Sequence, residues 1–248
     1  MATLRVAVIK CGTLSPEAKE KYICYYTLFK LLLEGAAERI NSPKKLDIFC
    51  FDPREDTNWP RLDEIDAVLI TGSTSSSFDP DPWITQVHDF VKSILAQDRV
   101  LLIGVCFGHQ ITARAIEGID AVGRNVRGWE LGVTNIDLTE RGKQVFGRND
   151  LAIQQVHRDE VLRAPKGVEI LGSSPMCAIQ SMYIAGRVLT VQGHPEIKDD
   201  IISELVHSRY EQGIISEEQF NEAITREGFD HHGEYIGEVF VKFLTGQL

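Results

Sequence analysis

A short apolar run that ends in a tight, cysteine-containing turn constrains this chain more than any other feature. Residues 100–103 read Val-Leu-Leu-Ile, which is typical of a strand buried on both faces of a sheet. A helix is expected from residue 111, so residues 104–110 must turn sharply. Cys106 occupies the corner, between glycines that permit close backbone approach. The pattern predicts strained backbone angles at Cys106 and a sulfur that faces the N-terminus of a helix.

This position favours a nucleophilic role for Cys106. Free N–H groups and the helix dipole stabilise a thiolate, which is the form that attacks a carbonyl carbon. A buried structural cysteine is the alternative interpretation. A second apolar strand at residues 187–191 is followed by His194 and Glu196. An imidazole and a carboxylate are the usual base and orienting group for a thiol, so we expect His194 to protonate the leaving amine and Glu196 to hold its other ring nitrogen.

The two motifs together resemble the class I glutamine amidotransferase family. They read Gly-Val-Cys-Phe-Gly-His-Gln at residues 104–110 and Gly-His-Pro-Glu at residues 193–196, in the order that the family shows. The resemblance spans approximately residues 4–197. It implies amide hydrolysis through a γ-glutamyl thioester on Cys106, with His194 and Glu196 completing a catalytic triad.

The resemblance also assigns a role to Gln110, one helical turn beyond the nucleophile, in binding a glutamine-like substrate. An exposed helix amide is the alternative. Two further segments are expected to line the pocket. Residues 154–161 resemble the segment that contacts the amino-acid head of the substrate, with His157 as a donor, although Asp159 could instead cap a turn. Residues 128–132 resemble a segment next to the active site, although Trp129 could simply be packed in a turn.

Acyl transfer also requires donors for the developing oxyanion. The backbone N–H of Phe107 is one candidate. The apolar strand at residues 67–70 is followed by a Gly- and Ser-rich loop that resembles the oxyanion loop of the family, which makes Gly72 and Ser73 the other candidates. The usual Gly-Gly-Pro of the family is Gly-Ser-Thr here, and a plain Ser-rich connector is the alternative.

The order of apolar segments alternates between strand and helix and predicts an α/β fold, a flavodoxin-like three-layer sandwich with a mixed, mostly parallel sheet. One domain of residues 1–248 is expected, with a core of about 4–197 and a helical C-terminal extension of about 198–248. Strands are predicted at residues 4–9, 46–51, 67–70, 132–138, 168–171, 177–180 and 188–191, the last four antiparallel, and helices at residues 16–40 and 82–96.

Composition excludes several classes of function. The 248 residues carry a net charge of −10 without a basic run, which argues against nucleic-acid binding. The apolar stretches are too short to span a bilayer and the N-terminus does not resemble a signal peptide, so we expect a soluble cytoplasmic protein. The five cysteines lack the spacing of metal ligands. We expect three histidines of the C-terminal segment to lie at the solvated surface, namely His207, His231 and His232. The sequence contains no phosphate-binding loop motif. Neither a cofactor nor a metal is expected.

Several functions remain open at the level of sequence. The segment after His157 and the lack of a synthetase domain resemble the stand-alone γ-glutamyl peptidase branch, which cleaves γ-glutamyl peptides or conjugates. A glutaminase subunit that feeds ammonia to a separate synthetase partner is the alternative within the enzyme class. A non-catalytic binding protein on the same scaffold, or a cysteine hydrolase or redox sensor of a neighbouring flavodoxin-like family, are alternatives that the complete set of Cys106, His194 and Glu196 disfavours.

Overall fold

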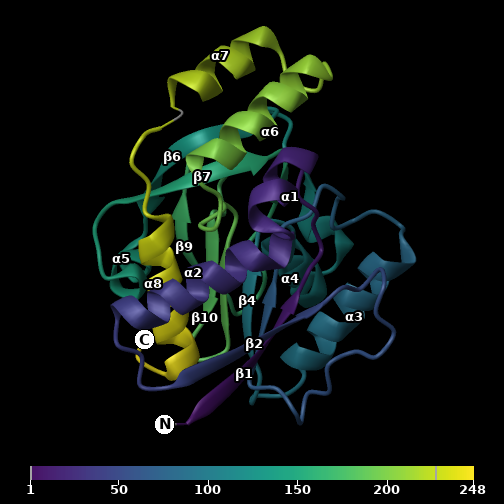
Figure 1. The fold of residues 1–248 in the computed structure, drawn as a ribbon, viewed down its shortest axis with the longest axis vertical. Helices are drawn as coiled ribbons and strands as arrows, with labels where there is room; N and C mark the ends of the chain where they lie inside the picture. The colour runs from purple at the N-terminus through teal and green to yellow at the C-terminus, as the bar shows by residue number, and fades with distance from the viewer. Residues whose placement is uncertain (1, 227) are drawn as a thin grey trace.

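A nine-stranded mixed sheet forms the centre of the protein (Figure 1). The computed structural model describes residues 2–226 and 228–248. The strand order is β2-β1-β3-β4-β11-β10-β9-β6-β7. The strands are β1 (Thr3–Ile9), β2 (Lys45–Phe51), β3 (Ala67–Ile70), β4 (Leu101–Val105), β6 (Glu130–Leu138), β7 (Leu151–His157), β9 (Glu169–Ser173), β10 (Ser181–Ile184) and β11 (Val188–Val191).

The first five strands in this order, β2 to β11, are parallel. The central strands β3, β4 and β11 are buried nearly throughout, whereas the edge strand β2 is partly exposed. Side chains of a strand alternate between the two faces of a sheet. Val6 and Val8 of β1 therefore pack into one hydrophobic cluster, whereas Ala7 and Ile9 pack into another. This arrangement explains why the strands read as continuous apolar runs, and the predicted α/β fold with a mostly parallel sheet is confirmed.

Helices cover both faces of the sheet. Helices α2 and α8 cross one face side by side, and α3 and α4 pack on the other (Figure 1). Gly237 of α8 lies directly against Leu32 of α2, where a Cβ would be only 2.8 Å from the leucine side chain, so glycine allows the two helices to approach closely. The helices are α1 (Pro16–Tyr22), α2 (Tyr25–Arg39), α3 (Pro82–Leu95), α4 (Phe107–Glu117), α5 (Glu140–Phe146), α6 (Asp199–Glu211), α7 (Glu217–Thr225) and α8 (Gly233–Thr245), with a 3₁₀ turn at Ile119–Ala121.

The prediction of one helix over residues 16–40 is wrong in one respect. The structure has two helices there, α1 and α2, with a break between them. Ser15 caps α1 by accepting a hydrogen bond from the Ala18 N–H, and the helix ends at Ile23, whose φ of 66° is rare for a β-branched residue. The chain restarts as α2 at Tyr25. The break places the Tyr25 side chain at the beginning of α2, where it points toward the site described below.

The second half of the sheet also corrects three expectations. The predicted strand at 177–180 is irregular, and the strand is β10, four residues later. Strand β11 pairs antiparallel with β10 but parallel with β4, so it belongs to the parallel half. Strand β7 lies where a polar pocket segment was expected. A separate two-stranded ribbon pairs β5 (Val122–Arg124) with β8 (Asp159–Val161).

The C-terminal segment is helical, as the sequence predicts. Helices α6 and α7 lie together at one end of the molecule beside β6 and β7, and the chain then returns to α8 (Figure 1). A capping box between Ser216 and Gln219 begins α7. His207 is exposed, as expected, but His231 and His232 are partly buried. His232 Nδ1 accepts a hydrogen bond from the Ala152 N–H at 2.8 Å, so this histidine ties the start of α8 to β7.

Candidate active site

The carboxyl ends of three neighbouring parallel strands meet at one edge of the sheet. Strand β4 lies between β3 and β11, with Gly104 in register with Ile70 and Val105 in register with Val191. The loops that follow these strands are therefore adjacent in space. Cys106, Gly72 and His194 lie on these three loops.

Cys106 occupies a strained corner between β4 and α4. Its φ of 52° and ψ of −103° lie outside the regions that L-residues normally adopt, and its N–H donates to the Val191 carbonyl at 2.9 Å. The flanking glycines leave no room for side chains. A Cβ on Gly104 would lie 2.5 Å from the Gly108 oxygen, and a Cβ on Gly108 would lie 2.2 Å from the Ile70 oxygen. The predicted corner is thus held by close backbone packing on both sides.

His194 and Glu196 form a buried pair beside this corner. His194 Nδ1 lies 2.7 Å from Glu196 Oε1, and both residues are nearly inaccessible to solvent. The Tyr25 hydroxyl donates to the same carboxylate oxygen at 2.6 Å. Cys106 is near enough to the His194 ring to affect its pKa. His194 and Glu196 are therefore in direct contact, on a loop adjacent to the one that carries Cys106.

The environment of His194 favours its protonated form. Burial alone lowers the pKa of an imidazole, but the negative charge of Glu196, the neighbouring Cys106 sulfur and hydrogen bonding outweigh it and raise the pKa of His194 to about 10. With Nδ1 facing Glu196, Nε2 is the nitrogen left for the thiol. A protonated imidazole in this position stabilises a neighbouring thiolate and can hand a proton to a leaving group.

The three oxyanion candidates lie at the same edge, in different surroundings. Gly72 lies against the His194 ring, so closely that a Cβ would be 2.7 Å from Cε1. Ser73 Oγ accepts hydrogen bonds from the Ser75 N–H at 3.1 Å and from the Arg54 guanidinium at 3.5 Å. Phe107 is the first residue of α4, so its N–H has no acceptor within the helix.

Gln110 is buried rather than exposed, which excludes the helix-surface alternative. Its Nε2 donates to the Asp159 carbonyl at 2.8 Å and to Gln192 Oε1 at 3.1 Å. Gln192 directly follows β11, and its own Nε2 is buried without a hydrogen-bond partner among the described residues. Gln110 thus connects α4 to the first residue of β8 and to the loop that carries His194.

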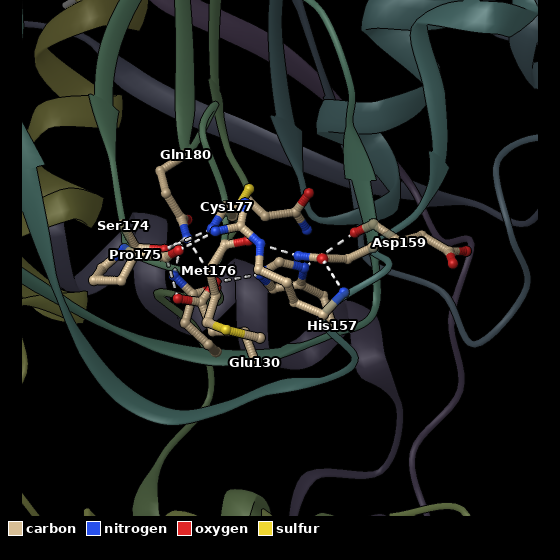
Figure 2. Close-up of polar contacts among 12 residues, drawn as sticks. Glu130, His157, Asp159, Ser174, Pro175, Met176, Cys177 and Gln180 are labelled. Atoms are coloured by element: carbon tan, nitrogen blue, oxygen red, sulfur yellow. Dashed lines mark hydrogen bonds and ion pairs between the residues drawn. The ribbon is translucent and has the colours of Figure 1, made fainter.

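His157 belongs to a buried polar network rather than to an open pocket wall (Figure 2). Its Nε2 lies 2.8 Å from Glu130 Oε2 and its Nδ1 lies 3.0 Å from the Asp159 carbonyl. Ser174 and Gln180 also donate to the Glu130 carboxylate, at 2.6 and 2.8 Å. Both ring nitrogens of His157 are therefore engaged inside the protein, and the expected donation from this ring to a substrate is not available in this geometry.

Comparisons with known proteins agree with the motifs. A family model described as glutamine amidotransferase class-I matches residues 29–202. The chain belongs to the class I glutamine amidotransferase family. A glutamine amidotransferase-like protein of Schizosaccharomyces pombe is 32% identical over 244 residues, which cover 96% of this chain and 98% of that protein. Gamma-glutamyl peptidase 2 of Arabidopsis thaliana is 28% identical over 223 residues, 88% of this chain and 86% of the relative.

A solved structure supports the fold of this amidotransferase-family chain. The glutaminase domain of CTPS from Trypanosoma brucei, with bound acivicin, superimposes with a TM-score of 0.62 at 15% identity and covers 99% of this chain and 95% of that one. An identity this low supports the fold alone. The predicted α/β architecture is therefore shared with a glutaminase domain, while the reaction has to be argued from the site.

Two residues of the site lie outside the matched family range and were missed by the sequence analysis. Tyr25, at the start of α2, contacts the Glu196 carboxylate, and Arg209, on α6, has its guanidinium 5.1 Å from the centre of the Trp129 ring. Trp129 is partly buried, and its Nε1 has no hydrogen-bond partner among the described residues. Neither Tyr25 nor Arg209 belongs to a local motif, so only the three-dimensional contacts reveal them.

The remaining titratable groups do not form a second centre in the part of the chain that the structure describes. No group of three or more His, Cys, Asp or Glu side chains gathers there in a way that could hold a metal ion. All five cysteines are free, and burial raises the pKa of the Cys11 and Cys177 thiols, which favours their neutral, unreactive forms. Among residues 2–226 and 228–248, no helix has the length and apolarity needed to cross a bilayer.

Proposed function

We propose that this protein is a cysteine-dependent hydrolase that cleaves γ-glutamyl amide bonds without a synthetase partner. The observation that carries the proposal is the placement of a strained Cys106 beside a buried His194–Glu196 pair in a chain of the amidotransferase family. The likeness to the Arabidopsis γ-glutamyl peptidase supports the choice of γ-glutamyl peptides or conjugates as substrates.

The proposed reaction has two steps. The Cys106 thiolate attacks the γ-carbonyl carbon, and backbone N–H groups of Phe107 and of the Gly72–Ser73 loop receive the oxyanion. When the tetrahedral intermediate collapses, the C–N bond breaks and the His194 imidazolium gives its proton to the departing amine. A γ-glutamyl thioester on Cys106 and a neutral imidazole remain.

Water completes the cycle. Neutral His194 takes a proton from a water molecule, and the resulting hydroxide adds to the thioester carbonyl. Collapse of this second intermediate breaks the C–S bond, releases the γ-carboxyl group of glutamate and restores the pair of Cys106 thiolate and His194 imidazolium. Glu196 stays ionised throughout and fixes the orientation of the ring.

The network around His157 has a supporting role in this proposal. His157 and Gln110 both donate to the Asp159 carbonyl and so fix the backbone of the loop between β7 and β8. The amino-acid head of the substrate, which carries an ammonium and a carboxylate, would then be recognised by backbone groups and carboxylates of this loop rather than by the His157 ring. In this proposal Gln110 does not contact the substrate and instead positions the backbone that binds it, through its hydrogen bond to the Asp159 carbonyl.

A panel of substrates on the purified chain tests the proposal. Glutamine, γ-glutamylglycine and glutathione are incubated with the protein, and released glutamate and ammonia are measured together. Glutamate released from the peptides without any second protein supports a peptidase. Ammonia formed from glutamine only after a synthetase is added would instead indicate the glutaminase-subunit alternative.

Covalent labelling separates an enzyme from a binding protein on the same scaffold. A glutamine-like electrophile such as acivicin, the ligand in the related glutaminase structure, is expected to form a C–S bond with Cys106 with loss of its chloride, so the tryptic peptide that contains Cys106 should gain the mass of acivicin less HCl. Cys50, which is exposed, provides the control for non-specific alkylation. Labelling at Cys50 with none at Cys106 would refute the nucleophile.

A further inference from the structure

Arg209 is a partly buried cation that lacks a carboxylate partner. Its Nη1 donates to the Leu205 carbonyl at 3.1 Å, and its guanidinium stacks on Trp129, but it forms no ion pair with any carboxylate in residues 2–226 and 228–248. Burial lowers its pKa. A cation removed from water without a counter-ion costs free energy, so such residues in enzymes commonly meet an anion that arrives with the ligand.

The surroundings of Arg209 place it at the proposed active site. Its positive charge is near enough to the Cys106 sulfur for the two groups to interact, and its stacking partner Trp129 precedes Glu130 in the network of Figure 2. Arg209 reaches this position from α6, the helix that begins three residues after Glu196. The C-terminal extension therefore contributes a positive charge beside the nucleophile.

The side of the site on which α6 lies indicates which part of a substrate Arg209 meets. The glutamyl head is assigned to the loop held by Gln110 and His157, which belongs to β7 and β8. The leaving amine must lie near His194, because this residue protonates it. The chain runs from Glu196 into α6, so we place the leaving residue on the side of the site from which α6 and Arg209 extend.

We propose that Arg209 binds a carboxylate of the leaving residue, so that the substrates are γ-glutamyl amino acids or peptides with a carboxylate close to the scissile bond, in preference to glutamine. The proposal rests on the hydrolase function proposed above. A guanidinium suits this task because its planar fork can donate two parallel hydrogen bonds to one carboxylate, and stacking on Trp129 holds the plane of the fork in place.

A pair of substrates that differ only in this carboxylate tests the proposal. γ-Glutamylglycine and γ-glutamylglycinamide share the head and the scissile bond. The ratio of their kcat/KM values is measured for the wild-type protein, for Arg209→Met and for Arg209→Lys. We expect the wild-type protein to prefer the acid by about 10- to 100-fold, the usual range for a hydrogen bond to a charged group. Arg209→Met should bring the ratio close to one, and Arg209→Lys should give an intermediate value.

Arg141→Met is the matched control, because the Arg141 guanidinium also stacks on an aromatic ring, 5.3 Å from the centre of Tyr183, on a different part of the molecule. This variant should keep the wild-type ratio. Circular dichroism and thermal melting establish that each variant is folded, and Arg209→Lys keeps the test decisive if Arg209→Met does not fold.

Three results would overturn the proposal. An equal loss on both substrates would place Arg209 at the glutamyl head, and an unaltered ratio in Arg209→Met would remove it from substrate recognition. A wild-type protein that hydrolyses neither substrate and is not labelled at Cys106 would instead refute the hydrolase function itself, which the first two results leave intact.

Discussion

Replacing Glu196 with glutamine removes one charge from the centre of the site with little change in shape. Glu196 Oε1 accepts from both His194 and Tyr25, whereas Oε2 has no hydrogen-bond partner among the described residues. In Glu196→Gln the amide oxygen can take the place of Oε1, and the amide nitrogen takes the position that lacks a partner. The change therefore tests the charge of Glu196 rather than its packing.

The expected magnitude follows from the pKa of His194. Its rise from 6.5 to about 10 corresponds to roughly 5 kcal/mol in favour of the imidazolium. Glu196 and the Cys106 thiolate both contribute, so we assign about half of this, roughly 2–3 kcal/mol, to Glu196. A loss of this size in the transition state slows the reaction by about 30- to 150-fold.

The pH dependence of kcat/KM is the assay. His194 must carry a proton to release the amine, so activity is lost as the pH rises through its folded-state pKa. The wild-type profile should fall on the alkaline side near pH 10, and the corresponding fall in Glu196→Gln should move to about pH 8, the value that the lost 2–3 kcal/mol implies. An alkaline limb that stays near pH 10, or a rate loss below about threefold, would refute this account of the pair.

The remaining predictions concern the neighbours of this pair. Cys106→Ala should abolish hydrolysis and leave the melting temperature nearly unchanged, since both residues place a Cβ at the same strained φ; residual turnover would contradict the nucleophile. Tyr25→Phe removes the hydroxyl that donates to Glu196 at 2.6 Å and should lower the free energy of unfolding by about 1.5–3 kcal/mol, measured by urea denaturation, and a change below 0.5 kcal/mol is the contrary result. Gly72→Ala places a Cβ 2.7 Å from His194 Cε1, so kcat should fall at least about tenfold while the circular dichroism spectrum is retained; full activity would show that the ring can move without cost.

Local patterns predicted the elements whose conformation local residues decide. The apolar run before Cys106 and the glycines around it specify a strand, a corner and a helix with little help from the rest of the chain. The predicted helix over residues 16–40 missed its break because the residue at positive φ is Ile23, where glycine or asparagine would have been the usual signal. Strand β7 was missed because Gln154, Gln155 and His157 are polar yet fully buried, which hides the apolar pattern of a strand.

The residues of the candidate site also fall into two groups, those that a local sequence motif predicts and those that only the packing of the fold reveals. The residues proposed as nucleophile and base, Cys106 and His194, stand in local sequence motifs, and the pairing of β4 with β11 makes their loops neighbours. Tyr25 contacts Glu196 from the first third of the chain, Arg209 contacts Trp129 from the last third, and both contacts depend on where α2 and α6 pack. Helix packing of this kind depends on contacts between residues far apart in the sequence, which a single sequence does not display.

The pairing of β11 with β4 has a consequence for a newly made chain. The thiol at residue 106 is synthesised long before residue 191, whose carbonyl fixes its backbone, and before the imidazole at 194. A ribosome-bound fragment that ends before β11 therefore carries an ordinary cysteine, without a neighbouring base. On the function proposed above, the reactive pair forms only when β11 docks beside β4, so the order in which the segments emerge would keep the nascent polypeptide from premature acylation.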